Sequence, residues 1–203
     1  RLGIAFADGN LDAALFLAMI AAFIFGMGMP TTPAYIIQAT LVAPALVELG
    51  ATPLSAHLFV FYYAVLGQIT PPVAVAAFAA APIAGASSTS VGWRAFALGM
   101  PAYVIPFLFV ANPVLLGQGG WGELLEVLSR SATAIVCLSI ALTGWLGGRA
   151  LGWIGRGMLL LAAALLIAPN HVLSAVAIVL CIGVWSIQWS GWSLHRLKGE
   201  PRD

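Results

Sequence analysis

The sequence predicts an all-α, polytopic membrane protein. Of its 203 residues, 62% are hydrophobic and only 7% are charged, whereas a soluble domain carries about a quarter charged residues. Several apolar runs are long enough to approach or cross a hydrocarbon layer of roughly 30 Å. Two of these runs are interrupted by clusters of Gly, Pro and Thr, at 26–33 and 67–72. We therefore expect a re-entrant helical hairpin and a discontinuous transmembrane helix, followed by additional transmembrane helices.

The charge balance narrows the possible partners. The net charge is +1 and the basic residues form no cluster, so we expect membrane lipid rather than nucleic acid around this chain. Cys137 and Cys181 lie in separate apolar runs, far apart in the sequence, and we interpret both as small packing residues. Because the chain starts at Arg1 without an initiator methionine or a signal peptide, we expect it to be the C-terminal portion of a longer protein.

The first two apolar runs, 11–29 and 33–49, form the predicted hairpin 11–49. The joint between them holds no charged residue, although a loop between two spanning helices normally reaches water and is polar. We therefore favour a hairpin that enters and leaves on one side of the membrane over two ordinary spans. Unpaired backbone groups cost several kcal/mol in hydrocarbon, so the tip of such a hairpin must lie against protein or a polar cavity.

The remaining elements follow along the chain. Residues 54–84 are too long for one straight helix and contain the second break, so we predict a broken helix there. Residues 85–96 are small and then amphipathic, which suits an interfacial connector, and 97–116 suit a transmembrane helix. Together with the hairpin and the broken helix they form a first region, 1–116, which we interpret as the C-terminal half of a transport or scaffold region. The C-terminal extension 117–203 is predicted to end in a polar tail. Its expected helices are 131–148, 151–168 and 171–192.

The basic residues set the expected orientation. With these spans, six of the eight basic residues fall on one side of the membrane, and the positive-inside rule makes that side cytoplasmic. The hairpin then opens outward and the C-terminal tail is cytoplasmic. The six residues are Arg94, Arg149, Arg156, Arg196, Lys198 and Arg202.

Each break contains a Thr-Pro pair, Thr32-Pro33 in the first and Thr70-Pro71 in the second. Thr is a good N-cap and Pro suits the first helical position, so each pair predicts a helix start in mid-membrane. A helix N-terminus carries about half a positive charge and free N–H groups, which attract carboxylates. The half-helix that ends before each start leaves free carbonyls. Together with Thr hydroxyls, these are hard oxygen ligands suited to Na⁺.

These roles select the candidate site residues. Neither break holds an acidic or basic residue, which disfavours a proton relay. The competing interpretation is that the prolines only kink helices, and that Gly26 and Gly28 only allow close helix packing. Gln68 could bind substrate or cap backbone, and both roles stay open. The substrate-binding candidates are Thr31, Thr32, Pro33, Gln68 and Pro71, and the Na⁺ candidates are Gly26, Gly28, Thr31, Thr32 and Thr70.

Catalytic chemistry is not expected. No Ser, His and Asp share one predicted surface, and no Gly-rich phosphate loop follows a strand. His57 lies near the exit of the hairpin, and we interpret it as an interfacial or packed residue. The sequence therefore predicts a protein that is not an enzyme.

Several motifs carry a family resemblance. They are Gly26–Thr32 with Ala34-Tyr35-Ile36, Val42–Leu46, His57–Tyr62, Ile69–Ala74, Ala84-Gly85-Ala86 and Asn112-Pro113. In this order they resemble the C-terminal half of the large membrane subunit of TRAP transporters. The resemblance is closest to fused permeases that work with TAXI-type solute-binding proteins. It covers about 1–116, and the helices within 121–192 resemble the C-terminal extension of fused forms.

The resemblance implies an elevator-type, Na⁺-coupled secondary transporter in a bacterial or archaeal cytoplasmic (inner) membrane. Such a protein imports a small organic anion, here expected to be a carboxylate, delivered by an extracytoplasmic solute-binding protein. Na⁺ is the implied coupling ion, and no other cofactor is expected. The inverted partner repeat would lie in the remaining N-terminal part of the permease, upstream of Arg1. The competing hypothesis is a membrane scaffold or assembly module that transports nothing.

Overall fold

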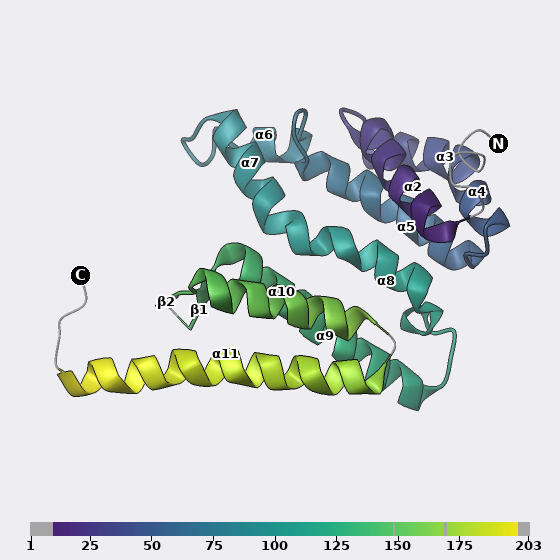
Figure 1. Cartoon of the computed structure of the whole chain (residues 1–203). Helices are drawn as coiled ribbons and strands as arrows, with labels where there is room; N and C mark the ends of the chain where they lie inside the picture. Colours follow the sequence, from purple (N-terminus) through teal and green to yellow (C-terminus); the bar gives the residue numbers. More distant parts are fainter. Residues whose placement is uncertain (1–9, 148, 169, 199–203) are drawn as a thin grey trace. The chain divides into compact units, whose positions relative to one another are not determined.

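The structure is a computed structural model of the chain. It describes residues 10–147, 149–168 and 170–198, with the backbone alone for 187–198. Its regular secondary structure is helical except for one pair of very short strands. It divides into two compact units, Arg1–Val127 and Leu128–Asp203 (Figure 1).

The predicted hairpin 11–49 consists of α2 (Leu11–Gly26), α3 (Thr31–Leu41) and α4 (Ala43–Glu48). Helix α2 starts where Asn10 supplies an N-cap, because the Asn10 side-chain oxygen accepts a hydrogen bond from the Asp12 backbone N–H at 2.9 Å. Helix α3 ends just before Pro44, which has no N–H to continue the helical ladder. The backbone between α2 and α3 is unwound.

Helix α5 (Pro53–Leu66) is the centre of the first unit and packs against α2, α3 and α4. It begins at a true Thr-Pro cap, because the Thr52 hydroxyl accepts a hydrogen bond from the Ser55 backbone N–H at 3.2 Å. It continues into a short 3-10 helix, η1 (Gly67–Ile69). The fully buried core side chains of α5 include Phe59, Val60 and Tyr63.

A stripe of small residues lets α2 approach α5 closely. Ala14, Ala18, Ala22 and Gly26 recur at every fourth position and are all buried, so they share one helix face. Small residues on such a face allow two membrane helices to bring their backbones together. The stripe ends at Gly26, so the close approach extends to the point where α2 unwinds.

The broken helix predicted at 54–84 consists of α5, η1 and the short helix α6 (Val75–Ala80). It is followed by α7 (Ser88–Gly99), a 3-10 turn η2 (Met100–Val104) and α8 (Ile105–Ala111). The last three run on as one helix, which is long and apolar enough to cross a membrane.

The bounds of this spanning helix differ from the predicted connector 85–96 and helix 97–116. The Ser87 hydroxyl accepts a hydrogen bond from the Ser90 backbone N–H at 3.3 Å, so the small polar residues begin the helix instead of forming a linker. The helix therefore starts at Ser88 and ends at Ala111.

The extension begins with α9 (Trp121–Thr143), the second helix of the described part that is long and apolar enough to cross a membrane. It starts earlier than the predicted helix 131–148. Strands β1 (Trp145–Leu146) and β2 (Arg149–Ala150) form an antiparallel turn after it. Helices α10 (Trp153–Ile167) and α11 (His171–Lys198) then lie side by side (Figure 1). They correspond to the predicted 151–168 and 171–192, and 199–203 of the predicted tail lie outside the described residues.

Two side-chain contacts connect α9 to the two helices that follow it, α10 and α11. The Arg156 guanidinium donates to the Ala141 carbonyl at 2.7 Å and to the Leu142 carbonyl at 2.9 Å, so it satisfies carbonyls at the end of α9. The Sγ atoms of Cys137 and Cys181 lie 3.2 Å apart, and both thiols are free. The two cysteines, distant in the sequence, are therefore neighbours in the fold.

The described part is consistent with the predicted all-α membrane protein: it holds two helices long and apolar enough to cross a membrane and exposes large apolar side chains on α2, α9 and α11. The re-entrant course of the hairpin and the orientation of the chain stay predictions.

Candidate functional site

The first break is an unwound segment between Gly26 and Thr31. The Met27 backbone N–H still bonds to the Phe23 carbonyl at 2.9 Å, and Gly28 then turns the chain with a φ of +76°, a conformation that favours glycine. Helix α3 begins at Thr31, with Pro30 at the N-cap position and no side-chain cap. The predicted N-cap at Thr32 is therefore wrong, although the helix start itself lies within the break.

The second break has a different local structure from the predicted one. The Thr70 hydroxyl donates back to the Leu66 carbonyl at 2.7 Å, so it closes the helix that ends instead of capping the helix that begins. A turn follows, closed by the Ala74 N–H on the Thr70 carbonyl at 3.1 Å, and α6 starts only at Val75. The predicted Thr70-Pro71 helix start is wrong, because these residues form the turn before α6.

The two breaks lie against each other. A Cβ added to Gly67 would lie 3.0 Å from the carbonyl carbon and oxygen of Gly26, so the two backbones are in direct contact. The Gln68 side chain donates from Nε2 to the Met29 carbonyl at 2.7 Å. This bond is the capping of backbone, one of the two roles left open for Gln68, and substrate binding by Gln68 stays a prediction. The ends of α2 and α5 thus meet at one point.

The predicted site residues separate into two groups. Gly26, Gln68, Thr70 and Pro71 lie at or beside this contact, and Gly26 and Thr70 are buried. The others lie on the exposed hairpin turn and the first turn of α3. In this group Gly28, Thr32 and Pro33 are exposed and Thr31 is half-buried.

A tyrosine that the sequence did not single out completes the second break. The Tyr103 hydroxyl lies 2.8 Å from the Thr70 hydroxyl, and the Tyr63 hydroxyl donates to the Tyr103 carbonyl. Tyr103 belongs to η2, so the break is tied to the spanning helix that follows it. Nothing in the local sequence around Tyr103 indicates this contact, because it depends on the packing of distant segments.

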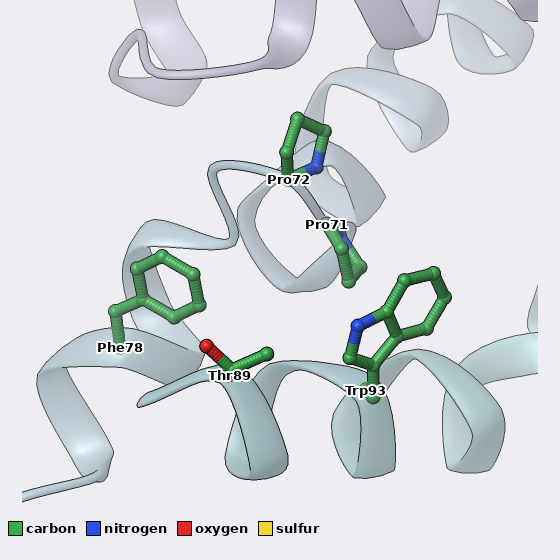
Figure 2. A pocket seen from close by; sticks show the side chains of 5 residues that line it. All are labelled: Pro71, Pro72, Phe78, Thr89 and Trp93. Atoms are coloured by element: carbon green, nitrogen blue, oxygen red, sulfur yellow. The ribbon is translucent and has the colours of Figure 1, made fainter. Parts of the chain in front are cut away.

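A cavity of about 280 Å³ adjoins the second break (Figure 2). Pro71 and Pro72 form one wall, and side chains of α6 and α7 form the rest. The lining is largely apolar, with one hydroxyl and one indole as its polar side-chain groups. The residues from the two helices are Phe78, Thr89 and Trp93.

Two further polar side chains connect α3 to its neighbouring helices, Gln38 to α2 and His57, from α5, to Tyr35. Gln38 is fully buried and donates from Nε2 to the Ala22 carbonyl at 3.3 Å, while its Oε1 has no hydrogen-bond partner in the described part of the chain. His57 lies 3.1 Å by its Nδ1 from the Tyr35 hydroxyl, and the two rings stack edge to face. The interpretation of His57 as a packed residue is in keeping with these contacts.

The oxygen atoms at the breaks are hydroxyls, carbonyls and an amide. Among the described residues, no three His, Cys, Asp or Glu side chains gather as a metal site would require. Neutral oxygens at unwound helix ends are the ligands with which membrane transporters coordinate Na⁺. The donor set of the two breaks therefore fits a monovalent hard cation.

The comparison with known families decides the identity of the chain. Residues 4–121 match the model of the family described as tripartite ATP-independent periplasmic transporter, DctM component. The chain belongs to this DctM family. The predicted resemblance to the TRAP transporter large subunit is thereby confirmed.

The DctM match covers both breaks, α2 to α8 and the start of α9. DctM components are multi-pass inner-membrane permeases of secondary transporters and associate with a solute-binding protein. They are a transporter family, not an enzyme family. No curated protein and no solved structure matches the chain significantly.

Proposed function

We propose that this DctM chain forms one half of a Na⁺-coupled, elevator-type transport site that imports a small organic anion. The observation that carries the proposal is the contact between the two helix breaks. Transporters place their binding sites where discontinuous helices meet at the bilayer midplane. Here the meeting point is held by the Gly26–Gly67 contact and the bond from Gln68 to Met29.

Na⁺ binds, in this proposal, to neutral oxygens around the breaks, with Thr70 as the side-chain ligand and backbone of Gly26 and Gly28 beside it. A Thr oxygen has one hydrogen and two lone pairs. The Thr70 hydroxyl donates its hydrogen to the Leu66 carbonyl, so its lone pairs can accept from or coordinate other partners. The carbonyls at the end of α2 supply further ligands of the same hard type.

The organic anion binds near the start of α3. The backbone N–H groups of Thr31 and Thr32 have no helical partners, since they belong to the first turn, and the positive end of the helix dipole favours a carboxylate there. The two hydroxyls add donors, and Pro33 fixes the turn. The start of α6 does not act as a second anion site, because this helix is only six residues long.

Pro71 contributes through the cavity that it lines. The largely apolar wall of this cavity suits the non-polar part of an organic acid, with Trp93 and Phe78 as the flat surfaces (Figure 2). The proposed substrate is therefore a carboxylate with an apolar portion, delivered by an extracytoplasmic solute-binding protein of the TAXI type to a fused permease. The upstream half of the permease supplies the inverted partner repeat.

An uptake screen tests the proposal. The complete permease and its solute-binding protein are reconstituted in liposomes, and a panel of radiolabelled monocarboxylates and dicarboxylates is offered with an inward Na⁺ gradient or with choline in its place. At least one acid is expected to accumulate only with Na⁺ and only with the binding protein present. Accumulation that is equal in Na⁺ and in choline would contradict Na⁺ coupling, and no accumulation of any acid would favour the scaffold hypothesis.

A further inference from the structure

The hydrogen bonds around Thr70 have a fixed direction. The Thr70 hydroxyl has a single hydrogen, and the 2.7 Å bond to the Leu66 carbonyl uses it. In the 2.8 Å contact between the Thr70 and Tyr103 hydroxyls, Tyr103 must therefore be the donor. One lone pair of the Thr70 oxygen accepts from Tyr103, and the other has no partner among the described residues.

Tyr103 is itself held on several sides. The buried Tyr63 donates its hydroxyl hydrogen to the Tyr103 backbone carbonyl. The Tyr103 ring stacks edge to face on Phe23 of α2, with ring centroids 5.3 Å apart, and tilts against Phe96 of α7 at 5.5 Å. The Tyr103 hydroxyl thus approaches Thr70 from a position fixed by α2, α5 and the spanning helix.

We propose that Tyr103 is a positioning residue for the coupling cation. Its hydroxyl and the Leu66 carbonyl hold the Thr70 oxygen from two directions, so that the remaining lone pair is fixed in place for a monovalent hard cation. Without the Tyr103 hydroxyl, the Thr70 side chain has one restraint fewer. The side chain must then be ordered when the cation binds, and this lowers the affinity for the cation. This inference rests on the proposed role of Thr70 in Na⁺ binding.

The Thr70–Tyr103 hydrogen bond also links the proposed cation site to the spanning helix. Tyr103 lies in η2, within the continuous helix Ser88–Ala111, so a displacement of the Thr70 oxygen changes a hydrogen bond to that helix. A cation at Thr70 would in this way stabilise the contact between the broken helix and the helix that follows it.

The test is binding of radioactive Na⁺ to the purified complete permease, measured by scintillation proximity without any organic substrate. Tyr103→Phe keeps the ring and removes only the hydroxyl. Loss of the one neutral hydrogen bond from Tyr103 should raise the Na⁺ concentration for half-saturation about two- to twelvefold. The number of binding sites should not change. Tyr35→Phe is the matched control, because it removes a hydroxyl that contacts His57, and it should leave Na⁺ binding unaltered.

A double-mutant comparison separates positioning from a general structural effect. If Tyr103 acts through Thr70, then Tyr103→Phe adds no further weakening in a Thr70→Val background, whereas Thr70→Ser with Tyr103 intact retains Na⁺ binding. Additive losses, or fewer binding sites with an unchanged half-saturation concentration, would overturn the inference.

The remaining outcomes distinguish this inference from the proposed function. Weakened Na⁺ binding in Thr70→Val with normal binding in Tyr103→Phe would refute the role of Tyr103 and leave the Na⁺ site at Thr70 standing. Normal binding in both variants would remove the Na⁺ site from Thr70, and the role of Tyr103 with it.

Discussion

A methyl group on Gly67 would lie 3.0 Å from the carbonyl carbon and oxygen of Gly26, and 3.1 Å from its Cα. All three atoms are backbone, so they cannot turn aside as a flexible side chain would. We expect Gly67→Ala to push the two breaks apart and to destabilise the complete permease by about 1–3 kcal/mol, the usual cost of overpacking. Thermal unfolding in detergent measures this loss.

Gly157→Ala is the control for that substitution. Gly157 lies in α10, where an added Cβ would meet nothing within 4 Å, and Ala favours a helix over Gly by about 1 kcal/mol. This variant should unfold at the wild-type temperature or above it. Equal unfolding temperatures for Gly67→Ala and Gly157→Ala would contradict the contact between the breaks.

The Thr-Pro pairs illustrate at the residue scale what the sequence could and could not predict. Thr52-Pro53, for which no cap was predicted, forms one at the start of α5, whereas Thr70 bonds backwards to Leu66 and Thr32 lies inside the first turn of α3. The local pattern is the same in all three pairs. The difference arises from partners far away in the sequence, such as Tyr103, which local spacing cannot identify.

At the scale of elements, apolar runs predicted the helices well and their ends less well. The hairpin arms and the broken helix follow from uninterrupted apolar sequence on each side of a Gly/Pro cluster. The ends were set by individual side chains: Ser87 starts α7, and Arg156 satisfies carbonyls at the end of α9. Arg156 also explains how a charged residue fits near the start of an apolar helix, since it contacts backbone and the Trp153 ring.

The packing of α9 against α11 can be tested through the two cysteines. Their Sγ atoms are 3.2 Å apart, so copper phenanthroline, an oxidant that removes two electrons and two protons from a thiol pair, should join Cys137 to Cys181 in isolated membranes. After denaturation, the oxidised protein should take up no maleimide-polyethylene glycol at these positions, and its gel shift should disappear.

The control for cross-linking is Cys181→Ser. In this variant Cys137 has no partner thiol, so its maleimide label should persist with and without the oxidant. Full labelling of both cysteines in the oxidised wild-type protein would contradict the packing of the second unit.

At the scale of the whole molecule, the order of motifs predicted the family, and the DctM match over 4–121 confirms it. Composition alone predicted a membrane protein. The candidate site was predicted only in outline, because the breaks were recognisable from Gly, Pro and Thr, whereas the contact between Gln68 and Met29 requires the fold. The small residues of α2, at every fourth position from Ala14 to Gly26, were a sequence signal for the close approach of α2 to α5.

In the proposed function, the two breaks of this DctM chain form an ion-coupled transport site. The most direct measurement compares wild-type protein with Thr70→Val and Thr70→Ser in liposomes that contain the complete permease and its solute-binding protein, using an acid found in the uptake screen. Initial uptake is recorded as a function of external Na⁺. We predict Na⁺-dependent uptake in wild-type and Thr70→Ser, and a loss of at least about tenfold in Na⁺ stimulation in Thr70→Val, as expected when a hydrogen-bonded oxygen ligand is removed. Uptake by Thr70→Val with an unchanged Na⁺ dependence would contradict the claim.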